Sequence, residues 1–465
     1  MTSDLFTRLL QEFSILGGLL ILGVLLRAKI KLFQNLFLPA AVIGGFIGLI
    51  FGPIVMKSFA ILPIPQDMIS DFALIPGILI LPIIASIPLG LGMERPGESM
   101  ATSKGGIFPM FLLGTACAFG LFALGFGTKM VFTKLMPDLD IYPAFGMELS
   151  LGFFGGHGTA GLIGNILQKL KMPYWEVAQG VAVTSATVGL VGGILLGMIL
   201  INTAARRNRI SHLADPSALP EETRKGYESD ISKQELTCRE TTHTSSIDSL
   251  AFHVAIVFSV CGLSYVLVGY LKAYRVPLLS NIAEWAYAIA IMLIVNLLIK
   301  KLKLSFLIDS RIKTKFTSFL VDFSIVAAIA SLPVQAVLKY AVPMVVMFIG
   351  GFILVYLIIV VLGNVFFQDY KFERAIALFG QSTGVIMTGI LLLRICDPDM
   401  KTPVLKDFSI SYALSTMLSY AMLLPVIRLL PNSGAIFLLT FGVASVLLII
   451  ALINYKVTTR GKKAS

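Results

Sequence analysis

Long apolar runs separated by short polar segments dominate this chain of 465 residues. Each run has few charged residues and approaches the roughly 20 residues that a helix needs to cross a bilayer. In the first half, the runs lie near 13–26, 36–56, 72–91, 107–132 and 177–201. In the second half, they lie near 250–270, 285–299, 319–338, 342–362, 408–430 and 435–454. No run has the short alternating pattern of a membrane strand, so we expect an all-α polytopic membrane protein with about eleven crossings.

Two further apolar segments, one in each half, are rich in glycine and in hydroxyl-bearing residues. The segment near 144–167 contains Gly155, Gly156, His157, Gly158 and Thr159. The segment near 372–393 contains Gly380, Gln381, Ser382, Thr383 and Gly384. Glycine and threonine are poor helix formers, and broken backbone at membrane depth is tolerated only where it is buried or lines a polar cavity. Two such breaks at matched positions favour the binding site of a secondary transporter.

The distribution of lysine and arginine predicts the topology of the chain. With the N-terminus outside, every basic cluster falls in the cytoplasm, provided that each glycine-rich segment enters and leaves the membrane on one side. The first re-entrant segment then enters from outside and the second from the cytoplasm. We therefore expect two inverted-topology repeats of about five helices, at 1–205 and 249–430. Polar residues 206–248 form a flexible cytoplasmic linker, and residues 431–465 add a transmembrane helix with a basic cytoplasmic tail.

Composition narrows the classes of function. Only 14% of the residues are charged, against roughly 25% in soluble domains. The net charge of +11 is explained by the basic loops, so we expect no nucleic-acid partner. The four cysteines have no paired spacing, which argues against a disulfide framework or a cysteine metal site. Walker A and HExxH sequences are absent, so we expect no enzyme activity.

A re-entrant hairpin exposes backbone N–H groups at one helix start and carbonyls at the other helix end. These groups suit a substrate carboxylate and a cation such as Na⁺, respectively. Candidate Na⁺ ligands with hydroxyl or carboxylate oxygens are Thr159, Asp322, Thr383 and Thr388. Close helix packing is the alternative role for small residues, and we expect it for two series with four-residue spacing. These series are Gly44, Gly48 and Gly52, and Gly189, Gly193 and Gly197.

Several polar side chains allow two readings each. His157 either hydrogen-bonds the substrate or satisfies a local carbonyl. Arg394 either meets a second substrate carboxylate or extends to the cytoplasmic interface, and Asp322 either binds a cation or faces water. Either Glu148 or Glu373 neutralises a cation, or both lie at the water interface. Residues Thr184, Ser185 and Thr187 either line the pathway or bond back to helical carbonyls.

The Gly-Gly-His-Gly-Thr element at 155–159 resembles the first re-entrant loop of sodium/glutamate symporters. The segment 372–399 is similar to the matching element of divergent members, and the resemblance covers about residues 5–430. It implies Na⁺-coupled glutamate uptake by an elevator-like movement, in a homodimer of the bacterial inner membrane. It also implies that Na⁺ is the coupling ion and that no organic cofactor is involved. Substrate binding is expected at residues 155–159 and 380–384, together with Arg394.

The second loop departs from the glycine- and alanine-rich form of better-known members, which leaves the substrate open. An alternative is a Na⁺- or H⁺-coupled carrier of another carboxylate, such as a citrate-like organic acid. A second alternative is a channel, or a membrane sensor that does not transport. The charged linker is the single feature that favours a signalling role.

Overall fold

The computed structural model describes residues 3–35, 38–90, 93, 106–207, 225–234, 238–243, 245–274, 276, 284–397 and 402–464. Its regular elements in these ranges are helices. Nine of the described helices are long and apolar enough to cross a membrane. The chain is therefore an all-α polytopic membrane protein, as its pattern of apolar runs predicts.

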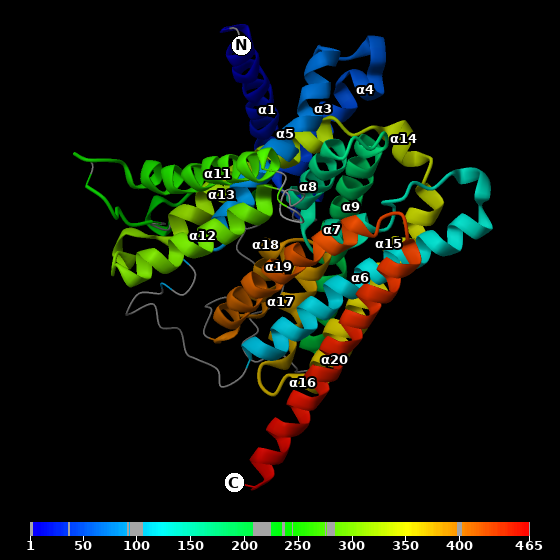
Figure 1. Cartoon of the computed structure of the whole chain (residues 1–465), viewed down its shortest axis with the longest axis vertical. Helices are drawn as coiled ribbons and strands as arrows, with labels where there is room; N and C mark the ends of the chain where they lie inside the picture. Colours follow the sequence, from blue (N-terminus) through cyan, green and yellow to red (C-terminus); the bar gives the residue numbers. More distant parts are fainter. Residues whose placement is uncertain are drawn as a thin grey trace.

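The helices pack in two groups (Figure 1). The first helix group contains α1 (Ser3–Lys29), α3 (Ala40–Phe51), α5 (Gln66–Ser86), α11 (Ser249–Ala273), α12 (Glu284–Lys301) and α13 (Ser310–Ala330). In this group α3 packs on α1 and α13, while α5 packs on α11, α12 and α13. Gly44 lies against the backbone of Leu19, and Gly48 lies against Ala330. These two glycines therefore have the predicted packing role.

The second helix group includes both glycine-rich segments and the helices packed around them. It contains α6 (Ile107–Leu135), α7 (Met147–Phe153), α8 (Gly156–Lys169), α9 (Trp175–Arg206), α15 (Ala341–Val355), α16 (Leu362–Phe366), α17 (Lys371–Thr383), α18 (Ile386–Cys396), α19 (Val404–Arg428) and α20 (Ser433–Ala464). Helix α20 runs along α6, and Figure 1 shows its end projecting beyond the other helices. The additional C-terminal helix thus packs on the second group.

Some expected crossings have different bounds in the structure. The helix expected at 319–338 is α13, which begins at Ser310 and ends at Ala330, because Pro333 follows; α14 (Val334–Leu338) is a separate short helix. Gly52 and Pro53 end α3 before the short α4 (Pro53–Met56). A π-helical turn, Tyr356–Val361, joins α15 to α16. Helices α12 and α13 are not among the nine spanning candidates, because both carry several charged residues.

Parts of the predicted linker lie against the first group. Gly226 contacts the Arg27 side chain at the end of α1. The backbone N–H of Arg239 donates to Asp309 Oδ2 over 3.3 Å, just before α13. The N–H groups of Thr241 and Thr242 donate to Ser249 Oγ, over 2.8 and 3.1 Å. These described parts are therefore held by hydrogen bonds and packing; residues 208–224 lie outside the described ranges.

Candidate functional site

Each glycine-rich segment folds as two helices separated by a break. Helix α7 ends at Phe153 and α8 begins at Gly156, which has a φ of +68°. Helix α17 ends at Thr383 and α18 begins at Ile386. A positive φ is readily adopted by glycine and disfavoured for other residues, which explains the glycine at the first break. Entry of each segment from a single side of the membrane stays a prediction.

The two breaks meet in the structure. A β-carbon at Gly156 would collide with the Val385 side chain and would lie 3.5 Å from the Gly384 carbonyl oxygen. Gly156 is the first residue of α8, and Val385 immediately precedes α18. The first N–H groups of a helix have no partner within it, and its N-terminus carries a partial positive charge. Two such ends at one point favour an anionic ligand.

Glycines of α9 make room for the end of α17. Gly189 lies against the Thr383 carbonyl and Gly193 against the Thr383 side chain. Gly197 lies against Leu392 of α18. In the second segment itself, Gly380 lies against the backbone of Gly389, so α17 and α18 approach closely. Gly189, Gly193 and Gly197 therefore have the predicted packing role. Two of them pack against Thr383, at the second break.

The threonine hydroxyls near the breaks are buried and bond to the backbone. Thr159 Oγ1 donates to the Gly156 carbonyl over 3.1 Å, and Thr383 Oγ1 donates to the Phe379 carbonyl over 2.8 Å. Thr388 Oγ1 accepts from the Val385 N–H over 3.4 Å. Because Thr159 and Thr383 donate their hydroxyl protons to carbonyls, the lone pairs of both hydroxyl oxygens stay free. A cation binds to such lone pairs. Their role as Na⁺ ligands stays a prediction.

His157 has one nitrogen bonded and one without a partner. Its Nε2 lies 3.0 Å from Thr187 Oγ1, which donates its own proton to the Val183 carbonyl. Thr187 therefore accepts from Nε2–H, and the neutral ring has a lone pair on Nδ1. The buried Nδ1 atom has no hydrogen-bond partner in the described part of the chain. Thr184, Ser185 and Thr187 all bond back to helical carbonyls, and Thr187 also orients His157.

The last turn of α17 contains further unpartnered polar atoms. Both amide atoms of Gln381 are buried and have no hydrogen bond among the described residues, while the buried Ser382 hydroxyl lies beside the Cys117 thiol. A buried polar atom without a partner costs about 1–3 kcal/mol. Such atoms are rare in folded proteins, and these are available to bind a ligand or a water molecule. His157 lies beside the first break and Gln381 in the last turn before the second, so each break has buried polar atoms close to it in the sequence.

A hydrogen-bond network anchors the base of the first segment. The Tyr142 hydroxyl and the Gly146 N–H donate to the fully buried Glu148 carboxylate, over 2.9 and 2.7 Å. Lys129 Nζ donates to the Pro143 carbonyl and to Ser433 Oγ, both over 2.7 Å. Glu148 is therefore held inside the protein rather than at the water interface. Sequence analysis did not select Lys129, although a lysine within an apolar run was a usable signal.

An ion-pair network anchors the base of the second segment. Arg374 is fully buried and donates to Asp407 Oδ2 over 2.7 Å, and its Nη2 lies 3.1 Å from Asp369 Oδ1. Its guanidinium also fills the space beside Gly106, which precedes α6. Helix α6 is thus fixed at both ends to the glycine-rich segments. The neighbouring Glu373 is buried as well and has a partner.

Two predicted site residues lie elsewhere. Asp322 is exposed on α13 in the first group, and no hydrogen bond or ion pair of the described residues links it to either break. Arg394 is exposed in the last turn of α18, at the end remote from the break. The structure therefore brings together the residues at 155–159, 380–384 and 388, and it does not bring Asp322 or Arg394 to them.

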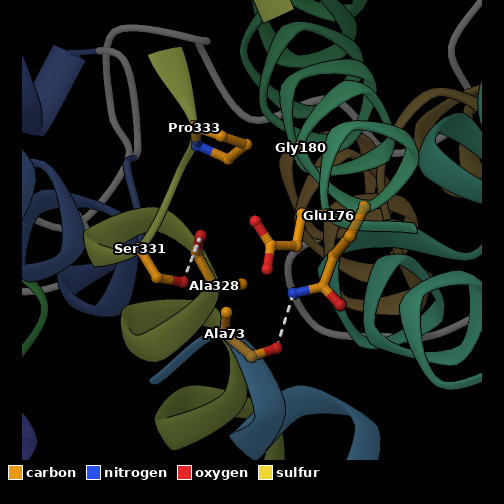
Figure 2. Close-up of a pocket in the computed structure, with 7 residues that line it drawn as sticks. Ala73, Glu176, Gly180, Ala328, Ser331 and Pro333 are labelled. Carbon is orange, nitrogen blue, oxygen red and sulfur yellow. Dashed lines mark hydrogen bonds between the residues drawn. The ribbon is translucent and has the colours of Figure 1, made fainter. Parts of the chain in front are cut away.

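A small polar cavity lies between the two groups (Figure 2). Its volume is about 30 Å³, which is enough for one water molecule and too small for a carboxylate substrate. It is lined by Ala73, Glu176, Gln179, Gly180, Ala328, Ser331 and Pro333. None of these belongs to the predicted substrate site, so the cavity is separate from the two breaks.

Comparison with protein-family models agrees with the family resemblance of the sequence. The model of the sodium/glutamate symporter family matches residues 8–385, which include both breaks. Helices α18, α19 and α20 lie beyond the match. A comparison with curated proteins gives no match. Because the family model covers most of its length, the chain belongs to the sodium/glutamate symporter family.

Proposed function

We propose that this protein is a secondary active transporter that couples the entry of Na⁺ to the uptake of glutamate. The observation that carries the proposal is the contact between Gly156 and Val385, which joins the N-termini of α8 and α18. Partial positive charge from two helix ends suits the substrate carboxylate. The lone pairs of Thr159, Thr383 and Thr388, one turn or less from the breaks, are the proposed Na⁺ ligands.

The unpartnered atoms favour an amino acid over a simple dicarboxylate. His157 Nδ1 and Gln381 Oε1 are acceptors, and they need a donor from the ligand. Carboxylates of glutamate are acceptors only, but its α-ammonium group has three N–H donors. Gln381 Nε2 and the helix N-termini can donate to the carboxylate. A citrate-like substrate offers a single hydroxyl donor and an extra negative charge, and the exposed Arg394 is not placed to meet that charge.

The packing of the first helix group supports inverted repeats. The α1–α3 contact has its counterpart in the α11–α12 contact of the second half. Likewise, α3 packs on α13 as α12 packs on α5, and α1 packs on α13 as α11 packs on α5. Exchanging the two halves thus reproduces these three contacts, as a two-fold relation would. We propose that repeats 1–205 and 249–430 have opposite orientations, with the N-terminus outside and the C-terminus in the cytoplasm.

We further propose that the second group moves against the first in an elevator-like manner, within a homodimer of the plasma (bacterial inner) membrane. Helices α8 and α9 provide the contacts with α5 and α13 across which this movement would occur. Both breaks belong to the second group, so a ligand between them would travel with it. The homodimer rests on the family resemblance.

Uptake of labelled glutamate into proteoliposomes tests the proposal, with and without an inward Na⁺ gradient. We expect concentrative uptake that requires Na⁺ and saturates with glutamate. Uptake driven by a proton gradient, or uptake of citrate but not glutamate, would replace the proposal with the organic-acid carrier. Ion current without saturable uptake would favour a channel instead.

A further inference from the structure

The cavity in Figure 2 is built by both helix groups. Ala73 of α5 and Ala328 of α13 belong to the first group, and Ser331 follows α13 directly. Glu176, Gln179 and Gly180 come from the first turns of α9 in the second group. Gln179 Nε2 donates to the Ala73 carbonyl over 2.8 Å, which connects the groups at the cavity wall. The cavity therefore exists only while the two groups are docked here.

Oxygen atoms of three kinds surround this space. In Figure 2 the Glu176 carboxylate points into it, and the main-chain carbonyls of Ala73 and Ala328 lie beside it. Ser331 Oγ donates to the Ala327 carbonyl over 2.8 Å, so lone pairs remain on its oxygen. Helix α13 ends at this place, where its last carbonyls lack helical partners and its C-terminus is partly negative. Glu176 is an exposed residue, so its carboxylate also reaches water, and the seven lining residues include no lysine or arginine that would compete with a cation for it.

We propose that this cavity binds one small hard cation such as Na⁺, with Glu176, Ser331 and the Ala73 and Ala328 carbonyls as ligands. One carboxylate with neutral oxygens is a suitable donor set for a hard cation, and about 30 Å³ admits one such ion. Because the ligands come from both groups, the bound ion stabilises the docked arrangement. This site is separate from the threonine oxygens at the breaks. Cation binding at this cavity does not depend on the proposed function. The effect of the ion on movement of the second helix group against the first does depend on it.

The test measures alkylation of Ala73→Cys in the purified full chain without any carboxylate substrate. The exposed Cys238 is first replaced by serine, and the other three cysteines are buried. We expect Na⁺ to slow alkylation at Ala73→Cys by a factor of 1 + [Na⁺]/Kd, about threefold at twice the Kd. Choline at the same ionic strength should not slow it, and adding Glu176→Gln should remove the protection. Ser70→Cys, an exposed position one turn earlier in α5, is the matched control and should not respond.

Equal alkylation rates in Na⁺ and choline would show a cavity that holds water only, and would overturn the inference. Full protection in Glu176→Gln would overturn it as well. Thr383→Ala separates this site from the substrate site. If that variant loses Na⁺-dependent glutamate binding but keeps the protection at Ala73→Cys, the cavity is a second, independent cation site. If Thr383→Ala abolishes the protection, the Na⁺ effect originates at the breaks and the inference fails, while the proposed function stands.

Discussion

Gly156 at the start of α8 lies directly against the side chain of Val385 at the start of α18. We expect Gly156→Ala to weaken glutamate binding and to lower the thermal midpoint. Its positive φ costs a side chain about 1–2 kcal/mol, and overpacking against Val385 costs about 1–3 kcal/mol more. Gly262→Ala in α11 is the matched control, because no atom lies within 4 Å of a β-carbon there and this helix belongs to the first group. Equal midpoints and affinities for the two variants would contradict the contact.

Gln381→Leu should remove the preference of the site for an amino acid. In the wild type we expect glutamate to compete for its own binding site roughly 10- to 100-fold better than glutarate, which lacks the ammonium group. Leucine removes both amide atoms, so affinity for glutamate should fall toward that for glutarate. The control is Thr440→Val in α20, a buried hydroxyl that bonds only to its own helix. An unchanged preference in Gln381→Leu would assign the recognition to other groups.

Sequence analysis could predict the two breaks because glycine clusters within apolar runs are a local signal. It could also predict a packing role for Gly189 and Gly193, because four-residue spacing places them on one face of a helix. The sequence pattern could not predict that Thr383 is the partner of these two glycines, because the contacts join positions almost 200 residues apart. Arg374 was missed for the same reason. Its partner Asp407 lies 33 residues away, so nothing local distinguished it from an interfacial arginine.

Asp322 and Arg394 were selected from the sequence as site residues, but the structure places both away from the breaks. Both were selected because charge within or beside an apolar segment often marks function. Whether such a side chain faces a site depends on the rotation of its helix against its neighbours. The structure turns Asp322 to the exposed side of α13 and leaves Arg394 exposed at the far end of α18. A single sequence does not contain that information.

Arg374→Met should destabilise the second group strongly. It would leave Asp407 buried and uncompensated, and losing one partner of a buried pair costs about 3–5 kcal/mol. We expect a lower thermal midpoint and less monodisperse protein after extraction. The double variant Arg374→Met with Asp407→Leu should recover part of this loss, because no unpaired carboxylate remains at residue 407. A single variant as stable as the wild type would show that the pair contributes little.

Lys169 and Glu284 form an ion pair between the groups, with Nζ 2.7 Å from Oε2. Lys169 is partly exposed, so we expect Lys169→Met to change stability by only about 0.2–1 kcal/mol. If the pair holds the docked arrangement, its loss should alter the rate of glutamate uptake more than the thermal midpoint. Exchanging the charges, with Lys169→Glu and Glu284→Lys, should restore only part of the rate, because Glu284 also lies 3.7 Å from Lys272. Proteoliposome uptake and thermal melts of the same preparations separate the two effects, and unchanged uptake in Lys169→Met would exclude a role in movement.

A disulfide between the groups should stop transport if α8 moves along α5. A β-carbon at Gly77 of α5 would lie 3.1 Å from that of Asn165 in α8, close to the roughly 3.8 Å of a disulfide. In a Cys238→Ser background, oxidation of the Gly77→Cys/Asn165→Cys variant should abolish Na⁺-driven glutamate uptake, and reduction should restore it. The matched control lies within the first group, where a β-carbon at Gly48 would stand 3.0 Å from that of Ala330. Oxidised Gly48→Cys/Ala330→Cys should transport normally, because α3 and α13 keep their relative positions. Normal uptake through an oxidised Gly77–Asn165 cross-link would refute movement of the second group along α5.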